Sequence, residues 1–148
     1  MKRVLALPAV VLMLCAFTSI GGVELPTQKP GLWKITMTST NMPGGTRSYK
    51  MCQDAASIAS GKASADAHLK NDCRRNELHQ AGSTFTADMD CTMSGIHVVS
   101  HSVTTVHGDD SYHTEITSTT GKDHSVMTVD NQWLGACKPG QKVGVPTS

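Results

Sequence analysis

The sequence has 148 residues, which is enough for one domain and little else. Its 13 basic and 12 acidic side chains give a formal net charge of +1, so there is no general electrostatic reason to bind nucleic acid or another polyanion. With 39% hydrophobic residues and almost no net charge, the composition also argues against an intrinsically disordered chain.

The N-terminus has the pattern of a secretory signal peptide, which we predict over residues 1–22. A basic start, Met1-Lys2-Arg3, precedes an apolar run over 4–17, and small and polar residues follow. The run is shorter than the roughly 20 residues that span a bilayer. An uncleaved anchor and a buried helix are the alternatives. We expect a domain at 23–148 that has no membrane span and is periplasmic or secreted.

Export would also explain the odd number of cysteines. Cys15 lies in the predicted signal peptide, and Leu14 before it does not fit a lipidation site. Four cysteines remain, an even number that indicates two disulfides in an exported protein: Cys52, Cys73, Cys91 and Cys137. Of the three possible pairings we favour Cys52–Cys73 and Cys91–Cys137. The first would attach a helical segment to the sheet, and the second would tie the last strand to a central one.

Alternation of hydrophobic and polar residues predicts strands along most of the remaining chain. A polar lead-in over 24–30 comes first, and the alternation begins with Trp33, Ile35 and Met37. The predicted strands are separated by turn sequences and cover residues 31–40, 46–52, 74–80, 84–91, 97–107, 112–119 and 124–133. Their regular spacing is typical of an antiparallel meander, and the many serines and threonines fit a sheet face exposed to water.

One segment, residues 54–70, differs because it is rich in alanine and poor in β-branched residues. It predicts a short or broken helix, with Asp54 as the N-cap and Gly61 weakening its middle. Beyond Cys137, proline, glycine and charged residues suggest a mobile tail. The predicted fold is mainly β: a curved antiparallel meander or partly closed barrel with one short helix and two disulfides.

Residues 29–37, Lys-Pro-Gly-Leu-Trp-Lys-Ile-Thr-Met, resemble the opening strand of the DUF3617 family, small exported bacterial proteins without an assigned function. The family usually has an acid where this chain has Lys34. Met42-Pro43-Gly44 is similar to the family's first turn, and residues 133–137, Trp-Leu-Gly-Ala-Cys, resemble its closing segment. The order of the four cysteines is also similar. The resemblance covers roughly residues 29–138. It implies an exported, β-rich domain and supplies no catalytic residues.

Large apolar side chains on the inward faces of the strands form a possible pocket: Trp33, Met37, Met51, Met89 and Met127. Methionine makes adaptable apolar surfaces, although ordinary core packing is the alternative. We predict a domain of unassigned biochemical activity that binds a small apolar ligand or a partner protein of the envelope. The alternatives are an envelope stress-protection or interaction protein and a periplasmic protein that binds copper or zinc.

Histidines are the basis of the metal alternative. His107 and His113 flank a tight turn, and with Met127 they could bind copper or zinc, because imidazole suits both metals and thioether favours Cu(I). Solvated strand histidines are the alternative. The sequence contains none of the G-x-S-x-G, H-E-x-x-H, G-x-G-x-x-G or Walker motifs, and no C-x-x-C pair. We therefore expect no enzymatic activity, no cofactor and no nucleic-acid partner.

Overall fold

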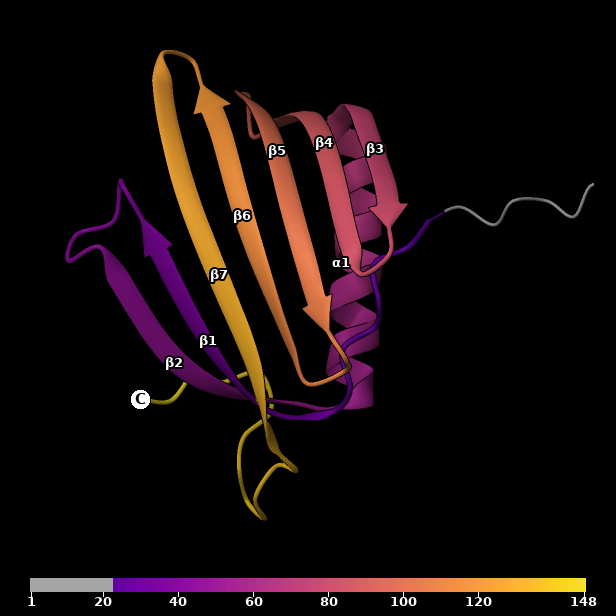
Figure 1. Cartoon of the computed structure of the whole chain (residues 1–148), viewed down its shortest axis with the longest axis vertical. Coiled ribbons are helices and arrows are strands. Elements are labelled where there is room, and N and C mark those ends of the chain that lie inside the picture. Colours follow the sequence, from indigo (N-terminus) through magenta and orange to yellow (C-terminus); the bar gives the residue numbers. More distant parts are fainter. Residues whose placement is uncertain (1–22) are drawn as a thin grey trace, which may run out of the picture.

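A computed structural model describes residues 23–148, so the predicted signal peptide lies outside the described residues. The described chain forms seven strands and one helix, all labelled in Figure 1. In chain order they are β1 (Gly31–Ser39), β2 (Thr46–Gln53), α1 (Ala55–Asp72), β3 (Cys73–Ala81), β4 (Thr84–Met93), β5 (Ile96–His107), β6 (Ser111–Thr120) and β7 (Asp123–Gly135). Within residues 23–148, no helix has the length and apolar character needed to cross a membrane.

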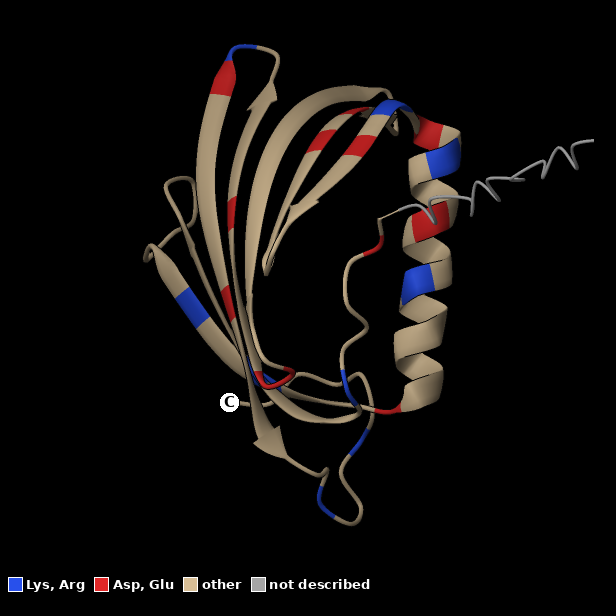
Figure 2. Cartoon of the chain, turned by 45° about the vertical axis from the view of Figure 1, so that its right-hand side comes forward, with Lys and Arg blue, Asp and Glu red and all other residues tan. Residues whose placement is uncertain are grey.

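The strands form one antiparallel sheet in the order β2-β1-β7-β6-β5-β4-β3. From β3 to β7 each strand pairs with the next, which confirms the predicted antiparallel meander. The first hairpin joins the end of that meander, because β1 pairs with both β2 and β7. The sheet is strongly curved but not closed, since β2 and β3 lie at its opposite ends (Figures 1 and 2).

Helix α1 carries the chain from β2 at one end of the sheet to β3 at the other. Its N-terminus has a capping box, in which the Asp54 carboxylate accepts the Ser57 backbone N–H at 2.7 Å and Ser57 Oγ accepts the Asp54 N–H at 3.0 Å. The hydrogen bond from the Ser57 backbone N–H, and after it the one from the Ser57 side chain to the carboxyl group, lower the pKa of Asp54. The helix continues through Gly61 without a break and buries no residue, because it is short of large apolar side chains.

The core is small and centres on β1. Trp33 is 1% exposed and Ile35 is 6% exposed, and they face Met51 and Tyr49 on β2. Further along the same face of the sheet, Phe85 on β4 is also buried. Most other side chains on this concave face are only half-buried. Helix α1 lies on the same side of the sheet (Figure 2).

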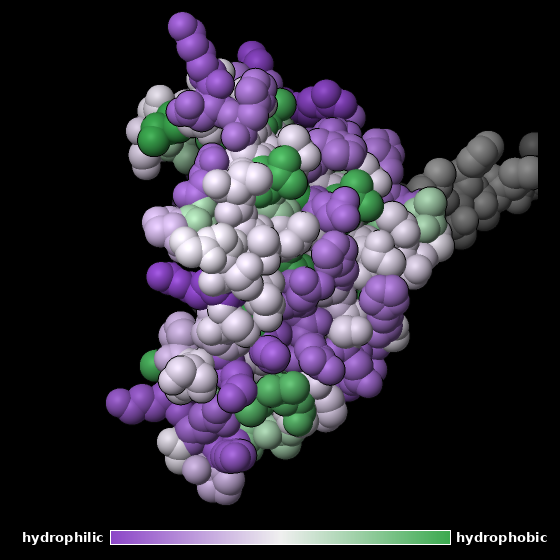
Figure 3. Space-filling model, turned by 60° about the vertical axis from the view of Figure 1, so that its left-hand side comes forward, coloured by the Kyte–Doolittle hydropathy of each residue, from purple (hydrophilic) through white to green (hydrophobic). Residues whose placement is uncertain are grey.

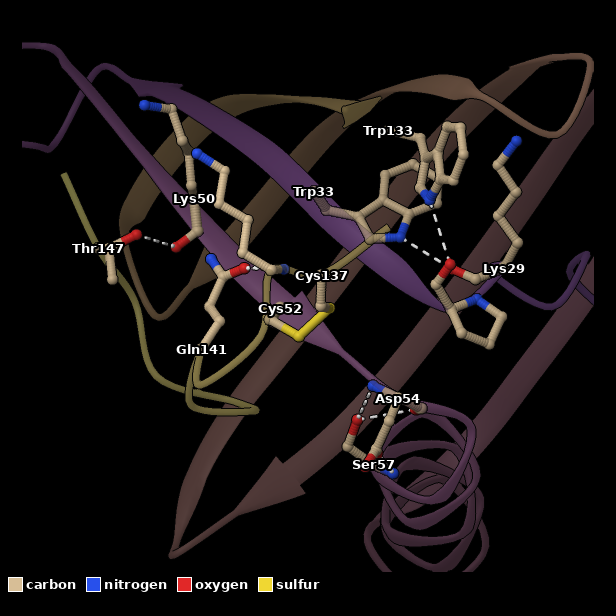
Figure 4. The surroundings of a disulfide bond; sticks show 12 residues. Lys29, Trp33, Lys50, Cys52, Asp54, Ser57, Trp133, Cys137, Gln141 and Thr147 are labelled. Carbon is tan, nitrogen blue, oxygen red and sulfur yellow. Dashed lines mark hydrogen bonds between the residues drawn. A yellow bond between two sulfur atoms is a disulfide. The ribbon is translucent and has the colours of Figure 1, made fainter. Parts of the chain in front are cut away.

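The predicted disulfide pairing is wrong. The bonds join Cys52 to Cys137 and Cys73 to Cys91. A helix of 18 residues is about 27 Å long, so α1 moves Cys73 far from Cys52. Cys73 instead faces Cys91 across the β3–β4 hairpin. The pairing of β1 with β7 brings the chain after β7 back to Cys52 at the end of β2 (Figure 4).

The segment after Cys137, expected to be a mobile tail, is docked on the outer edge of β2. Thr147 and Lys50 exchange two backbone hydrogen bonds of 2.8 Å, and the Gly144 N–H donates to the Cys52 carbonyl oxygen at 2.8 Å. Val143 forms a further bridge with Cys52. The segment therefore covers the outer edge of β2 around Lys50 and Cys52, and Cys52 is only 2% exposed.

Candidate ligand-binding cavity

A cavity of about 310 Å³ lies between the lead-in segment, residues 24–30, and the concave face of the sheet. The lead-in segment passes between α1 and the sheet and forms one wall (Figure 2). The residues of this wall are Leu25, Pro26, Thr27 and Gln28. The opposite wall is made by β1, β5, β6 and the turn between β5 and β6, through Trp33, Thr104, Val106, Gly108, Asp109, Ser111, Tyr112 and Thr114.

The sheet side of the cavity is aromatic and aliphatic at its centre. The Trp33 and Tyr112 rings lie 5.7 Å apart between centroids, tilted by 52°, which is a favourable aromatic arrangement. Val106 is the register partner of Tyr112 on β5. The hydroxyls of Thr104 and Thr114 hydrogen-bond to each other at 2.9 Å, so each already has a partner.

Two polar groups stand out on the lining. The Tyr112 hydroxyl oxygen accepts a hydrogen bond from Gln28 Nε2. Burial, with a smaller contribution from Tyr49, raises the pKa of Tyr112 to about 12, so the phenol keeps its proton at neutral pH and can donate a hydrogen bond to a ligand. The other group is the carboxylate of Asp109. Its side chain is 78% exposed, which shows that it lies at the rim of the cavity.

The lead-in segment is fixed at its C-terminal end by Lys29 and Pro30. Trp33 Nε1 donates to the Lys29 carbonyl oxygen at 2.9 Å, and Trp133 Nε1 donates to that of Pro30 at 3.2 Å (Figure 4). The Lys29 ammonium lies 3.7 Å from the centre of the Trp133 ring and forms an ion pair with Asp110. The hydrogen bond to Asp110 is the main cause that raises the pKa of Lys29. The lysine, proline and tryptophan of the opening motif thus hold the cavity wall in place.

Of the five residues predicted to form a pocket, the structure brings one to this cavity. Trp33 lines it. The methionines lie on the same concave face by register and are half-buried, but they do not belong to its lining: Met37, Met51, Met89 and Met127. The predicted pocket did not include Val106, Tyr112 or the lead-in segment, all of which line the cavity. The only available signal was the apolar pair Leu25-Pro26 within an otherwise polar lead-in.

The candidate metal residues lie on the opposite, convex face. His107 and His113 border a shallow hollow there, whereas Met127 faces the concave side and cannot join them. His113 Nδ1 lies 2.6 Å from Asp130 Oδ1, and Nε2 lies 3.5 Å from Glu115 Oε1. Within residues 23–148, no group of three or more histidine, cysteine, aspartate or glutamate side chains is arranged to hold a metal ion.

The pairing of His113 with Asp130 predicts a pH-dependent contribution to stability. The hydrogen bond to Asp130 is the main cause that raises the pKa of His113 above 6.5. The folded state therefore binds the proton more tightly, so the stabilisation is fully present below pH 6.5 and is lost as the pH rises through the raised pKa. We expect His113→Asn to destabilise the protein at about pH 5.5 and to have a smaller effect at about pH 9, measured by urea unfolding. Asp130→Asn should remove the same pH dependence, and an unchanged profile in both variants would contradict the pairing.

The fold and the cavity together define a class of protein: a small disulfide-bonded domain in which an open antiparallel sheet and an N-terminal segment enclose an apolar cavity. The chain belongs to the family described as protein of unknown function (DUF3617), whose model matches residues 28–137. The matched region contains all seven strands and the four bonded cysteines. The family resemblance of the opening strand is thereby confirmed. No curated protein and no solved structure matches the chain.

Proposed function

We propose that this chain is an exported binding protein whose cavity holds a small apolar ligand. The observation that supports it is the cavity of about 310 Å³, with Trp33, Val106 and Tyr112 on one side and Leu25 and Pro26 on the other. Binding pockets for small molecules usually measure about 300–1,000 Å³ and combine apolar walls with a few polar groups. The volume suits a ligand of roughly ten non-hydrogen atoms, since a water-sized group occupies about 30 Å³.

The proposal places the protein in the periplasm or outside the cell. Support comes from the two disulfides, which persist mainly in oxidising compartments, and from the predicted signal peptide. Fractionation of cells that express the full, untagged chain, followed by N-terminal sequencing of the product, tests this location. Recovery of a chain that begins near residue 23 in the periplasm or medium would support export, and an intact chain in the cytoplasm would contradict it.

A ligand in the cavity is favoured over a partner protein that docks beside β2. On the side of the molecule where β2 lies, hydrophobic side chains form small separate patches among hydrophilic ones (Figure 3). Contiguous apolar patches, rather than scattered side chains, are typical of protein interaction sites. The concave face, in contrast, carries half-buried apolar side chains next to the cavity.

Filling the cavity is expected to weaken ligand binding strongly. Val106→Trp places an indole in the cavity, whereas Val126→Trp makes the same change at a side chain on β7 that is 50% exposed and lies outside the cavity. We expect decanol, titrated by calorimetry, to bind at least tenfold more weakly to Val106→Trp and unchanged to Val126→Trp. Circular dichroism would confirm that both variants fold. Equal decanol affinity in both variants would overturn the proposed site.

A further inference from the structure

The charges around the cavity indicate which class of apolar ligand it prefers, an inference that rests on the proposed function. Among the described residues that line the cavity, Asp109 is the only one with a charged side chain at neutral pH. Apolar atoms and neutral polar groups make up the remainder of the wall. A ligand with a polar end therefore meets a carboxylate at the rim and neutral groups, including the protonated Tyr112, inside.

The charge of Asp109 is only partly compensated. Lys29 pairs with Asp110 and lies 3.4 Å from Asp109, so one ammonium serves two carboxylates and the rim has a net charge of −1. The Lys29 ammonium is also held over the Trp133 ring, and Lys29 does not belong to the cavity lining. Asp110 has the closer contact with Lys29, and Asp109 is the carboxylate that borders the cavity.

We propose that the cavity takes a cationic apolar ligand, an alkyl- or arylamine, with its body between the lead-in segment and Val106 and its ammonium group at Asp109. An amine gains attraction from the net negative rim and can donate hydrogen bonds to the carboxylate. A carboxylic acid of the same length would bring a second negative charge to that rim. Because Asp109 is largely exposed, water and salt reduce these effects, and a several-fold change in affinity is the expected scale.

The test compares three ligands that share a ten-carbon chain and differ in the charge of the head: decylamine, decanol and decanoate. Each is titrated into the oxidised protein by calorimetry at about pH 7 and low salt, below the concentration at which the ligand aggregates. We expect decylamine to bind about fivefold more tightly than decanol, and decanoate to bind most weakly. Asp109→Asn should remove the advantage of decylamine over decanol.

Asp123→Asn is the matched control, because it removes the same charge at the other end of β6, at the start of β7. It should leave the order of the three affinities intact. If none of the three ligands binds, the proposed function fails. If decanol binds but decylamine has no advantage, or if Asp109→Asn retains that advantage, the inference about charge is overturned while the cavity remains a binding site.

Discussion

Replacing Gly31 by alanine is expected to destabilise the protein by about 3 kcal/mol. Gly31 has φ = +146°, a conformation that residues with a Cβ rarely adopt. Its Cα also faces Trp133, so an added methyl group would overlap the indole nitrogen and approach the Gly135 carbonyl oxygen to 2.5 Å. The substitution would displace Trp133 from its position beneath Lys29 and loosen the anchored end of the lead-in segment.

Urea unfolding measures this effect, and Gly61→Ala is its control. Gly61 lies within α1 with nothing near an added Cβ, so alanine there is expected to stabilise the protein by up to about 1 kcal/mol. The two glycine substitutions should therefore change stability in opposite directions. An unaltered stability of Gly31→Ala would mean that Trp133 does not lie against Gly31.

Removing the Cys52–Cys137 bond is expected to have the largest effect of any change considered. The bond joins residues 85 apart, and the loop-entropy model gives a stabilisation of about 4.5 kcal/mol for a loop of that length. The Cys73–Cys91 bond joins residues only 18 apart and gives about 3 kcal/mol in the same model. Loss of the first bond also releases the C-terminal segment from the edge of β2, because Cys137 leads into it.

Double serine variants of each pair separate the two contributions. Cys52→Ser with Cys137→Ser should lower the free energy of unfolding more than Cys73→Ser with Cys91→Ser, both measured against the oxidised protein. Peptide mapping of the unreduced protein should first show the two expected crosslinked peptides. A greater loss of stability in the second variant would indicate that native contacts, rather than loop length, dominate the effect of these bonds.

The individual elements could be predicted because their signals are local. Alternation around Trp33 and Ile35 marked β1 as residues 31–40, against Gly31–Ser39 in the structure. The alanine-rich composition and the N-cap Asp54 similarly located α1. Each depends on neighbours within a few residues, and the meander from β3 to β7 follows when consecutive strands pair.

The remaining features depend on contacts between distant parts of the chain. Nothing local in β1 indicates that its second partner is β7, and that pairing decides which cysteine reaches Cys52. The cavity also depends on contacts between distant parts of the chain. The lead-in segment has no periodic pattern, and its position is set by contacts of Lys29 and Pro30 with Trp33 and Trp133. The sequence pattern identified inward faces correctly but could not show which part of the concave face would be covered.

The position of β7 has a consequence for the order in which the molecule assembles. It is the last strand in the chain, yet it lies inside the sheet between β1 and β6. Strands β3 to β7 pair with sequence neighbours and can form early, whereas pairing of β1 with β7 closes a long loop and is intrinsically slow. In a chain that emerges N-terminus first, the β1–β2 hairpin must wait, with one edge unpaired and Trp33 exposed, until residues 123–135 arrive. Cys52 likewise lacks its native partner until Cys137 follows that strand, so the first hairpin is the last part of the sheet to reach its final contacts.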